Sequence, residues 1–225
     1  MIPFRDANPS SRVPIVTVGL ILINALFFLQ EVGMGEALQS FIYAYGVVPQ
    51  KWLFAGQSPE LMPKAIAATY LTSMFLHGGW MHLIGNMWYL WIFGDNIEDR
   101  LGHLRFLIFY LLCGILAGAA HTAFNLNSAM PAVGASGAIA GVLGAYLVLF
   151  PHARVQTLVP LFLSYQVMEL PALIVLGGWF FMQFLNGTAS IALTAQGGGV
   201  AWWAHIGGFL AGIVLLSVFH PRRRR

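Results

Sequence analysis

The stretch that decides the fold is Gly134-Ala-Ser-Gly-Ala-Ile-Ala-Gly-Val-Leu-Gly-Ala-Tyr-Leu-Val-Leu-Phe150, which is followed by Pro151. It predicts a helix that begins at Ser136, because serine is a preferred N-cap residue, and that ends before Pro151, which lacks a backbone donor. At about 1.5 Å per residue this helix is about 21 to 23 Å long, whereas the hydrocarbon core of a bilayer is about 30 Å thick. The helix is therefore too short to span a membrane.

A short helix of this kind places its N-terminal end at membrane depth. Free backbone N–H groups and a serine hydroxyl are tolerated there only where they line a cavity that is walled by protein and contains water. We therefore expect Ser136 to form the floor of a hydrated pocket.

The composition is typical of a polytopic membrane protein. Charged residues make up 8% of the chain, hydrophobic residues make up 58%, and the mean hydropathy is +0.75, whereas about a quarter of an average soluble domain is charged. A chain of 225 residues allows about six spans of about 20 residues and leaves no room for a sizeable soluble domain. We expect an all-α fold with a single membrane domain over residues 1–225.

Six apolar segments supply the expected spans. Between the first and second of them, residues 32–67 are amphipathic and rich in aromatic residues, which favours a loop that lies in the membrane interface. The first span follows a polar stretch without a small-residue cleavage site, so we expect it to be an anchor that is retained. The expected spans are residues 14–31, 80–96, 103–123, 136–150, 167–187 and 200–220.

The positions of lysine and arginine predict the orientation. With six spans both termini share a side, and most of the basic residues fall on that side, including the arginine tail at 221–225. By the positive-inside rule, residues 1–13 and 221–225 are cytoplasmic. The basic residues fit topology and anionic lipid headgroups, so we expect no nucleic-acid partner. The six-span plan without a transit peptide favours a bacterial inner membrane.

Three polar residues fall at one depth. Counted from the cytoplasmic ends of their helices, His82, Ser136 and His205 stand about 20, 21 and 24 Å above that face. The fourth span carries glycines at 137 and 141, and the sixth carries glycines at 208 and 212. Because small residues four apart allow helix backbones to approach closely, we expect Ser136 to contact His205.

A serine beside an imidazole at a helix N-terminus is an activated nucleophile. His205 would accept the hydroxyl proton as Ser136 attacks a carbonyl carbon, and it would then return that proton to the leaving amine. Backbone N–H groups around Ser136, together with His82 and Asn86, would stabilise the oxyanion. No carboxylate is expected at this depth, so the pattern predicts a dyad rather than a triad.

The motifs resemble those of the rhomboid intramembrane serine proteases. The resemblance covers most of the chain from about residue 41 to residue 212. It implies that Ser136 is the nucleophile and His205 the base, and that His82, Asn86 and the Ser136 amide form the oxyanion pocket. It further implies cleavage of single-span membrane substrates without a cofactor or metal. The motifs are Gly134-Ala-Ser-Gly-Ala138, Ala204-His-Ile-Gly-Gly208, His82 with Asn86, and Gly94-Asp-Asn-Ile-Glu-Asp-Arg-Leu-Gly-His-Leu-Arg-Phe106.

Two alternatives and two departures from the family pattern stay open. A transporter could use the same polar residues as a proton path, and a non-catalytic relative could bind membrane segments.

Where some relatives stack an aromatic residue on the imidazole, this chain has Ala140, which leaves open what orients His205. Where some relatives have a bulky aromatic residue that helps to close the gap between the second and fifth spans, this chain has Gly85, so either Trp179 contributes more to gating or access to the site is looser. Substrate identity and oligomeric state are not predicted.

Overall fold

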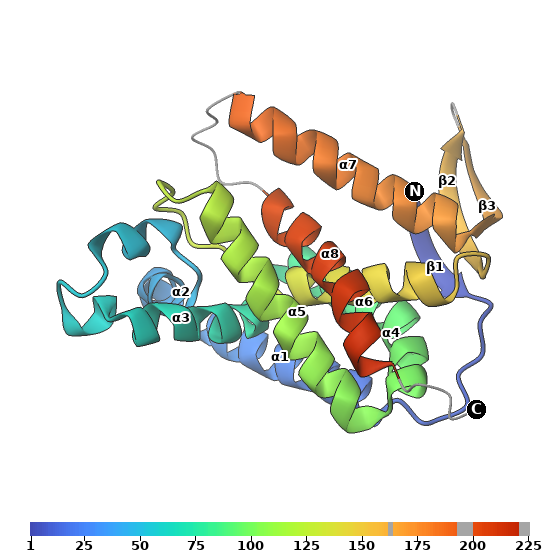
Figure 1. Ribbon diagram of the computed structural model, residues 1–225, viewed down its shortest axis with the longest axis horizontal. Coiled ribbons are helices and arrows are strands. Elements are labelled where there is room, and N and C mark those ends of the chain that lie inside the picture. Colours follow the sequence, from blue (N-terminus) through green and yellow to red (C-terminus); the bar gives the residue numbers. More distant parts are fainter. Residues whose placement is uncertain (162–163, 193–199, 221–225) are drawn as a thin grey trace.

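The structure is a computed structural model that describes residues 1–161, 164–192 and 200–220, and it is mostly helical (Figure 1). Short 3₁₀ turns (η1–η4) connect several of the helices. The α-helices are α1 (Ile15–Gly33), α2 (Leu38–Tyr45), α3 (Pro63–Thr72), α4 (Trp80–Leu101), α5 (His103–Phe124), α6 (Ser136–Leu149), α7 (Ala172–Ala192) and α8 (Trp202–Phe219).

Four helices in the described ranges are long and apolar enough to cross a membrane, namely α1, α5, α7 and α8. The helix α6 is apolar but has only 14 residues, which corresponds to about 21 Å. The helix α4 has 22 residues, but its last two turns carry Asp95, Glu98, Asp99 and Arg100. The chain is therefore a membrane protein with a short helix at the expected place, and the count of six spans stays a prediction.

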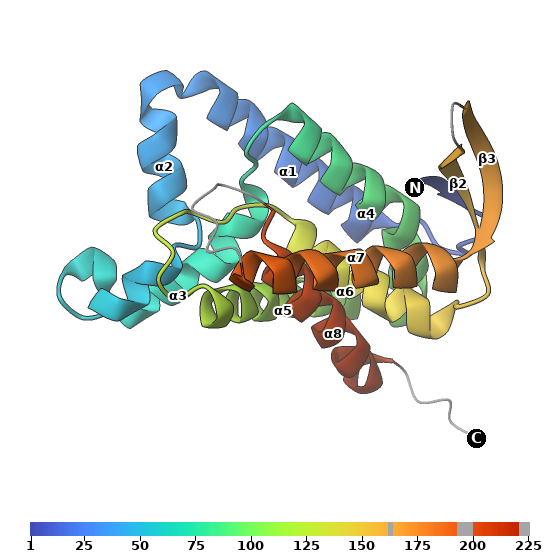
Figure 2. The same ribbon diagram turned by 90° about the horizontal axis from the view of Figure 1, so that it is seen from above.

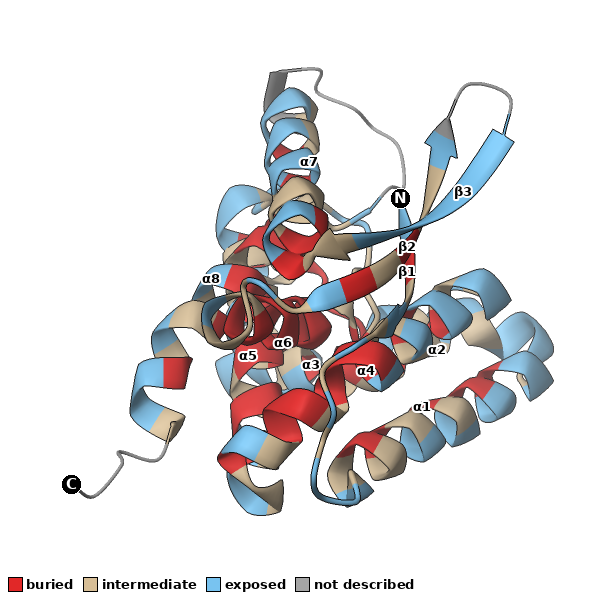
Figure 3. Cartoon of the chain, turned by 90° about the vertical axis from the view of Figure 1, so that its right-hand side faces the viewer, coloured by how far each residue is buried: buried red, intermediate tan, exposed pale blue. Residues whose placement is uncertain are grey.

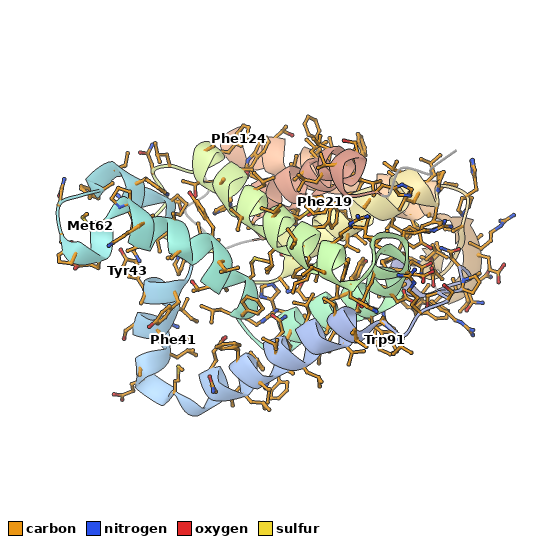
Figure 4. The ribbon with its side chains drawn as sticks, turned by 60° about the horizontal axis from the view of Figure 1, so that its bottom comes forward. Phe41, Tyr43, Met62, Trp91, Phe124 and Phe219 are labelled. Atoms are coloured by element: carbon orange, nitrogen blue, oxygen red, sulfur yellow. The ribbon has the colours of Figure 1, made fainter. Side chains whose placement is uncertain are left out.

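Apolar side chains project outward around the bundle, as expected of a surface that faces lipid. Figure 4 shows Met62 and Tyr43 at the end formed by α2 and α3, and Phe124 along the upper edge at the end of α5. Trp91 on α4 is 59% exposed and Leu26 on α1 is 62% exposed. Exposure of many large apolar residues on long helices indicates an apolar surrounding medium.

The expectation of an all-α fold is wrong, because the described residues include a three-stranded antiparallel sheet in the order β1-β2-β3. Its strands are β1 (Ile2–Asp6), β2 (Arg154–Leu161) and β3 (Ser164–Pro171). The helix of the fifth expected span, α7, therefore begins at Ala172, five residues after the expected start of that span. Burial alternates along this part of β2: Val155 and Thr157 are fully buried, while Gln156 between them is half-buried.

The strand β1 lies between α4 and α7 (Figures 2 and 3). Trp88 on α4 donates its indole N–H to the carbonyl oxygen of Pro3 over 2.8 Å. On the other side, a Cβ added to Gly178 on α7 would lie 3.9 Å from the methyl group of Met1. Residues 2–6 therefore form a packed part of the fold and not a free polar arm.

A buried carboxylate joins α4 to the start of α1. Glu98 is 1% exposed and accepts hydrogen bonds from the backbone N–H groups of Val16 and Thr17 and from the Thr17 hydroxyl. It also lies 2.6 Å from Nδ1 of His103. The carboxylate of Glu98 therefore caps the N-terminus of α1, where a negative charge is favourable.

The helix α6 forms the centre of the bundle. Every residue from Gly137 to Tyr146 is buried, and Figure 3 shows this helix enclosed by its neighbours. Its most extensive contacts are with α8, and α5 packs against both. The loop before α6 is fixed by paired backbone hydrogen bonds between Val47 and Ala132.

Candidate active site

Ser136 is the first residue of α6, as expected, but the N-cap position belongs to Ala135 and no side chain caps the helix. The serine hydroxyl is consequently free for another partner. Its Oγ lies 2.8 Å from Nε2 of His205 on α8. The contact between Ser136 and His205 that the sequence predicts is present.

Glycines on the two helices make this contact possible. A Cβ added to Gly208 would overlap the carbonyl oxygen of Gly137, and a Cβ added to Gly212 would overlap that of Gly141. The backbones of α6 and α8 therefore touch directly along two turns, as small residues four apart allow. This approach carries His205, one turn before Gly208, up to the hydroxyl of Ser136.

The imidazole of His205 has a second polar partner on α7. Gln183 places its Oε1 2.7 Å from Nδ1 of His205, and the Gln183 side chain is 7% exposed. The ring centroids of Trp179 and His205 are 5.7 Å apart at an interplanar angle of 35°. Together these residues answer what orients His205 when Ala140 offers no ring to stack upon.

Sequence reasoning did not single out Gln183, although a signal was available. A polar amide in an apolar helix is rare at membrane depth and marks a site by default. Gln183 follows Trp179 by four residues, so both side chains lie on one face of α7. A search for carboxylates alone overlooks such a neutral partner.

His82 and Asn86 converge on the loop immediately before Ser136. A Cβ added to Gly134 would lie 2.7 Å from Cε1 and 2.8 Å from Nε2 of His82, and 3.4 Å from Nδ2 of Asn86. Gly134 has φ of 120°, and its N–H donates to the carbonyl oxygen of Ser73 over 2.9 Å. Only glycine combines this backbone conformation with so close a contact.

His82 and Asn86 can each donate an N–H group to an acceptor beside Gly134. Nδ1 of His82 accepts from the N–H of Gly78 over 3.3 Å, so a neutral His82 carries its proton on Nε2, the nitrogen beside Gly134. Asn86 is 7% exposed, and its Nδ2 has no acceptor among the residues that the structure describes. A buried donor without a partner is costly, and an incoming oxygen atom would satisfy it.

The side chain of His77 packs against that of His82. The side chain of His77 is only 2% exposed. The two imidazole centroids are 5.3 Å apart, and the backbone N–H of His77 donates to the carboxylate of Glu31 on α1. These two contacts of His77 hold the loop that precedes α4 in place.

A rhomboid domain matches residues 65–222 of the chain. The chain belongs to the rhomboid family. It is 31% identical to "Rhomboid protein 1, mitochondrial" of Saccharomyces cerevisiae over 186 residues, which are 77% of this chain and 48% of that protein. It is 32% identical to "Rhomboid protease GluP" of Bacillus subtilis over 144 residues, 64% of this chain and 25% of that one.

This rhomboid protein spans about half or less of the length of these curated relatives. A third, the human "Presenilin-associated rhomboid-like protein, mitochondrial", is 28% identical over 166 residues, 70% of this chain and 39% of that protein. The yeast, plant and mammalian relatives are all named as mitochondrial. These names do not fit the expectation of a bacterial inner membrane.

A small cavity adjoins Ser136. It measures about 30 Å³, and its walls include Ser73, His121, Gly134 and Ser136. A cavity of this size with several polar groups in its walls can hold one water molecule. The serine at the start of α6 therefore borders a space that water can occupy, as the short helix leads one to expect.

Proposed function

We propose that this chain is an intramembrane serine endopeptidase that uses a dyad of Ser136 and His205. The observation that carries the proposal is the 2.8 Å approach of Ser136 Oγ to His205 Nε2 at the N-terminus of a helix too short to span a bilayer. One curated relative is named a rhomboid protease, which supports the same reaction class.

The first half of the reaction forms an ester. Ser136 Oγ attacks the scissile carbonyl carbon, and its proton moves to Nε2 of His205. The oxyanion that develops is stabilised by the Ser136 amide, by Nε2–H of His82 and by Nδ2–H of Asn86, and the positive end of the α6 dipole adds to this stabilisation. The C–N bond then breaks, and the leaving amine takes the proton from Nε2.

The second half hydrolyses the ester. A water molecule attacks the acyl carbon and transfers a proton to Nε2 of His205. The bond from the carbonyl carbon to Ser136 Oγ breaks, and the proton returns from Nε2 to that oxygen. The cavity beside Ser136 is large enough for one water molecule.

The substrates we propose are single-span membrane proteins, cut near the extracytoplasmic end of their membrane segment. Ser136 begins α6, whereas Arg154, one of the basic residues expected on the cytoplasmic side, follows the other end of this helix. With six spans and cytoplasmic termini, water would reach the dyad from the extracytoplasmic side. No further protein partner is required by this chemistry.

Labelling with a fluorophosphonate probe tests the proposal. The purified protein in detergent should form a covalent adduct at Ser136, and the variants Ser136→Ala and His205→Ala should lose the adduct and the cleavage of a single-span substrate by at least about 10³-fold. Ser217→Ala on α8 is the matched control, since that hydroxyl bonds back to Val214 of its own helix.

The outcome also separates the alternatives. A transporter or a non-catalytic rhomboid-like protein that binds membrane segments needs no activated hydroxyl, so it would not be labelled. A folded wild-type protein that is neither labelled at Ser136 nor able to cleave any tested membrane segment would refute the proposal. Equal labelling of wild type and His205→Ala would refute the role of His205 as base.

A further inference from the structure

The hydrogen bond between Gln183 and His205 joins α7 to the dyad. Nδ1 of His205 lies 2.7 Å from Oε1 of Gln183, while Nε2 of the same ring lies 2.8 Å from Ser136 Oγ. Both nitrogens of a ring that is 9% exposed are therefore engaged. The three side chains form a line from α7 through α8 to α6.

The chemistry of the amide determines where the imidazole carries its proton. The structure places the amide of Gln183 with its carbonyl oxygen Oε1, which can only accept, facing the ring, and in this orientation Nδ1 is the protonated nitrogen of the neutral imidazole. Nε2 then has a free lone pair directed at the Ser136 hydroxyl. The opposite tautomer would place a proton on Nε2, which would make His205 a donor to Ser136 and useless as its base.

No other contact in the described part of the chain performs this selection. Trp179 and Trp202 contact the His205 ring through their faces and edges, which limits the tilt of the ring but does not distinguish its two nitrogens. The described residues give Nδ1 no other hydrogen bond. The choice of tautomer therefore rests on one side chain.

We infer that Gln183 is the positioning residue of the dyad, holding His205 in the tautomer that accepts the Ser136 proton. This inference rests on the proposed function. Gln183 takes the place that a carboxylate has in a triad, where loss of the acceptor leaves the imidazole in the wrong tautomer. It does so without the cost of burying a charge at membrane depth.

Because Gln183 is neutral, it can stabilise the protonated form of His205 without taking the proton from it. When Nε2 takes the serine proton, the imidazolium carries a full charge, and the carbonyl dipole of Gln183 stabilises it through a charge-assisted hydrogen bond. The amide cannot accept the proton itself, so the proton stays on the imidazole until the amine leaves. Gln183 thus acts through His205 and touches neither the substrate nor Ser136.

The variant Gln183→Met tests this role, because methionine has a similar length and shape but no strong acceptor. We expect kcat and the rate of fluorophosphonate labelling to fall about 10- to 100-fold, the usual effect of removing a group that orients a reacting side chain. KM should change less than about twofold, because Gln183 is buried behind the ring. Asn186→Leu is the matched control, since Asn186 on the same helix bonds back to Met182.

Nitrogen NMR of the imidazole gives the decisive signature. With ¹⁵N-labelled histidine, and with His205→Ala to assign the signal, the wild type should show a protonated Nδ1 and an unprotonated Nε2. Gln183→Met should show the two forms mixed. A merely structural contact would change the melting temperature but would leave the tautomer of the folded protein unaltered.

The outcomes separate the two proposals. Wild-type protein that is labelled at Ser136, together with a folded Gln183→Met variant that has wild-type kcat and an unchanged tautomer, would overturn the role of Gln183 alone. Wild-type protein that is not labelled would overturn the proposed function, and the NMR comparison would still decide whether Gln183 selects the tautomer.

Discussion

The contact between α6 and α8 differs in kind from the contact between α7 and α8. In the first, glycines bring two backbones together, so that any Cβ at Gly208 or Gly212 would overlap a carbonyl oxygen of α6. In the second, long side chains bridge the helices: the rings of Phe180 and Phe209 stack with centroids 4.5 Å apart, and Gln183 reaches His205. Many residues of α7 face outward, including Phe181 and Met182.

The difference separates two tasks of the candidate site. The reacting atoms of Ser136 and His205 are carried by backbones in direct contact, which leaves little freedom for their distance to change. The orientation of the imidazole is set from α7, whose contacts run through side chains with rotatable bonds. We therefore expect substitutions in the first contact to destroy the fold or the dyad, and those in the second to weaken activity in steps.

The largest effect is expected for Gly212→Ala. The added methyl group would overlap the backbone of Gly141, so α6 and α8 must separate, and overpacking of this kind destabilises by about 1 to 3 kcal/mol or more. We expect a lower melting temperature in detergent and loss of probe labelling. Gly177→Ala on α7 is the control, because nothing lies within 4 Å of its added Cβ.

The control sharpens the comparison. Alanine at position 177 should leave stability unchanged or raise it by up to about 1 kcal/mol through its higher helix propensity. If Gly212→Ala were as stable and as active as Gly177→Ala, the two helix contacts would not differ as proposed.

An intermediate effect is expected for Phe180→Ala, which removes the ring that stacks on Phe209. Because Phe180 is only half-buried, the loss of stability should be about 1 to 2 kcal/mol, less than the 3 to 5 kcal/mol typical of a fully buried phenylalanine. Labelling of Ser136 should fall in part, as α7 holds Gln183 less firmly. Complete loss of labelling in a folded variant would contradict the assignment of α7 to orientation alone.

The sequence predicts the first contact well and the second poorly, for a physical reason. Glycines at 137, 141, 208 and 212 repeat at helical spacing, and helix length alone fixes the depth of Ser136. The partner of His205 on α7 depends instead on the rotation of that helix about its axis. No local pattern reports that rotation, so the pairing of Gln183 with His205 became evident only in the structure, although a polar amide in an apolar helix is visible in the sequence.

The sheet shows a second limit of the sequence. Residues 2–6 pair with residues 155–158 across most of the chain, and such a pairing leaves no periodic signal near either segment. In a chain with mean hydropathy +0.75, residues 167–171 read as the start of the fifth span, because the adjacent apolar residues Val167 and Met168 interrupt the alternation expected of a strand.

The smallest effect is expected for Asp6→Asn, at the end of β1 beside Tyr146 of α6 and near Asp95 of α4. Burial raises the pKa of Asp6 to about 6, against the hydrogen bond that the Tyr146 hydroxyl donates and with the nearby Asp95 adding to the rise. Since this folded-state pKa exceeds the ordinary value of 3.8, the ionised carboxylate destabilises the folded protein above about pH 6, and this effect vanishes as the pH falls towards 4.

Asparagine resembles the protonated carboxyl and still accepts from Tyr146, so Asp6→Asn should be more stable than the wild type at pH 8 and equal to it near pH 4. Partial exposure limits the gain to about 1 kcal/mol or less. Melting temperatures of both proteins between pH 4 and pH 8 measure it, with Glu169→Gln on the exposed part of β3 as the control. A gain that grows as the pH is lowered would have the wrong sign, and it would mean that β1 requires the charge of Asp6 to stay in place between α4 and α7.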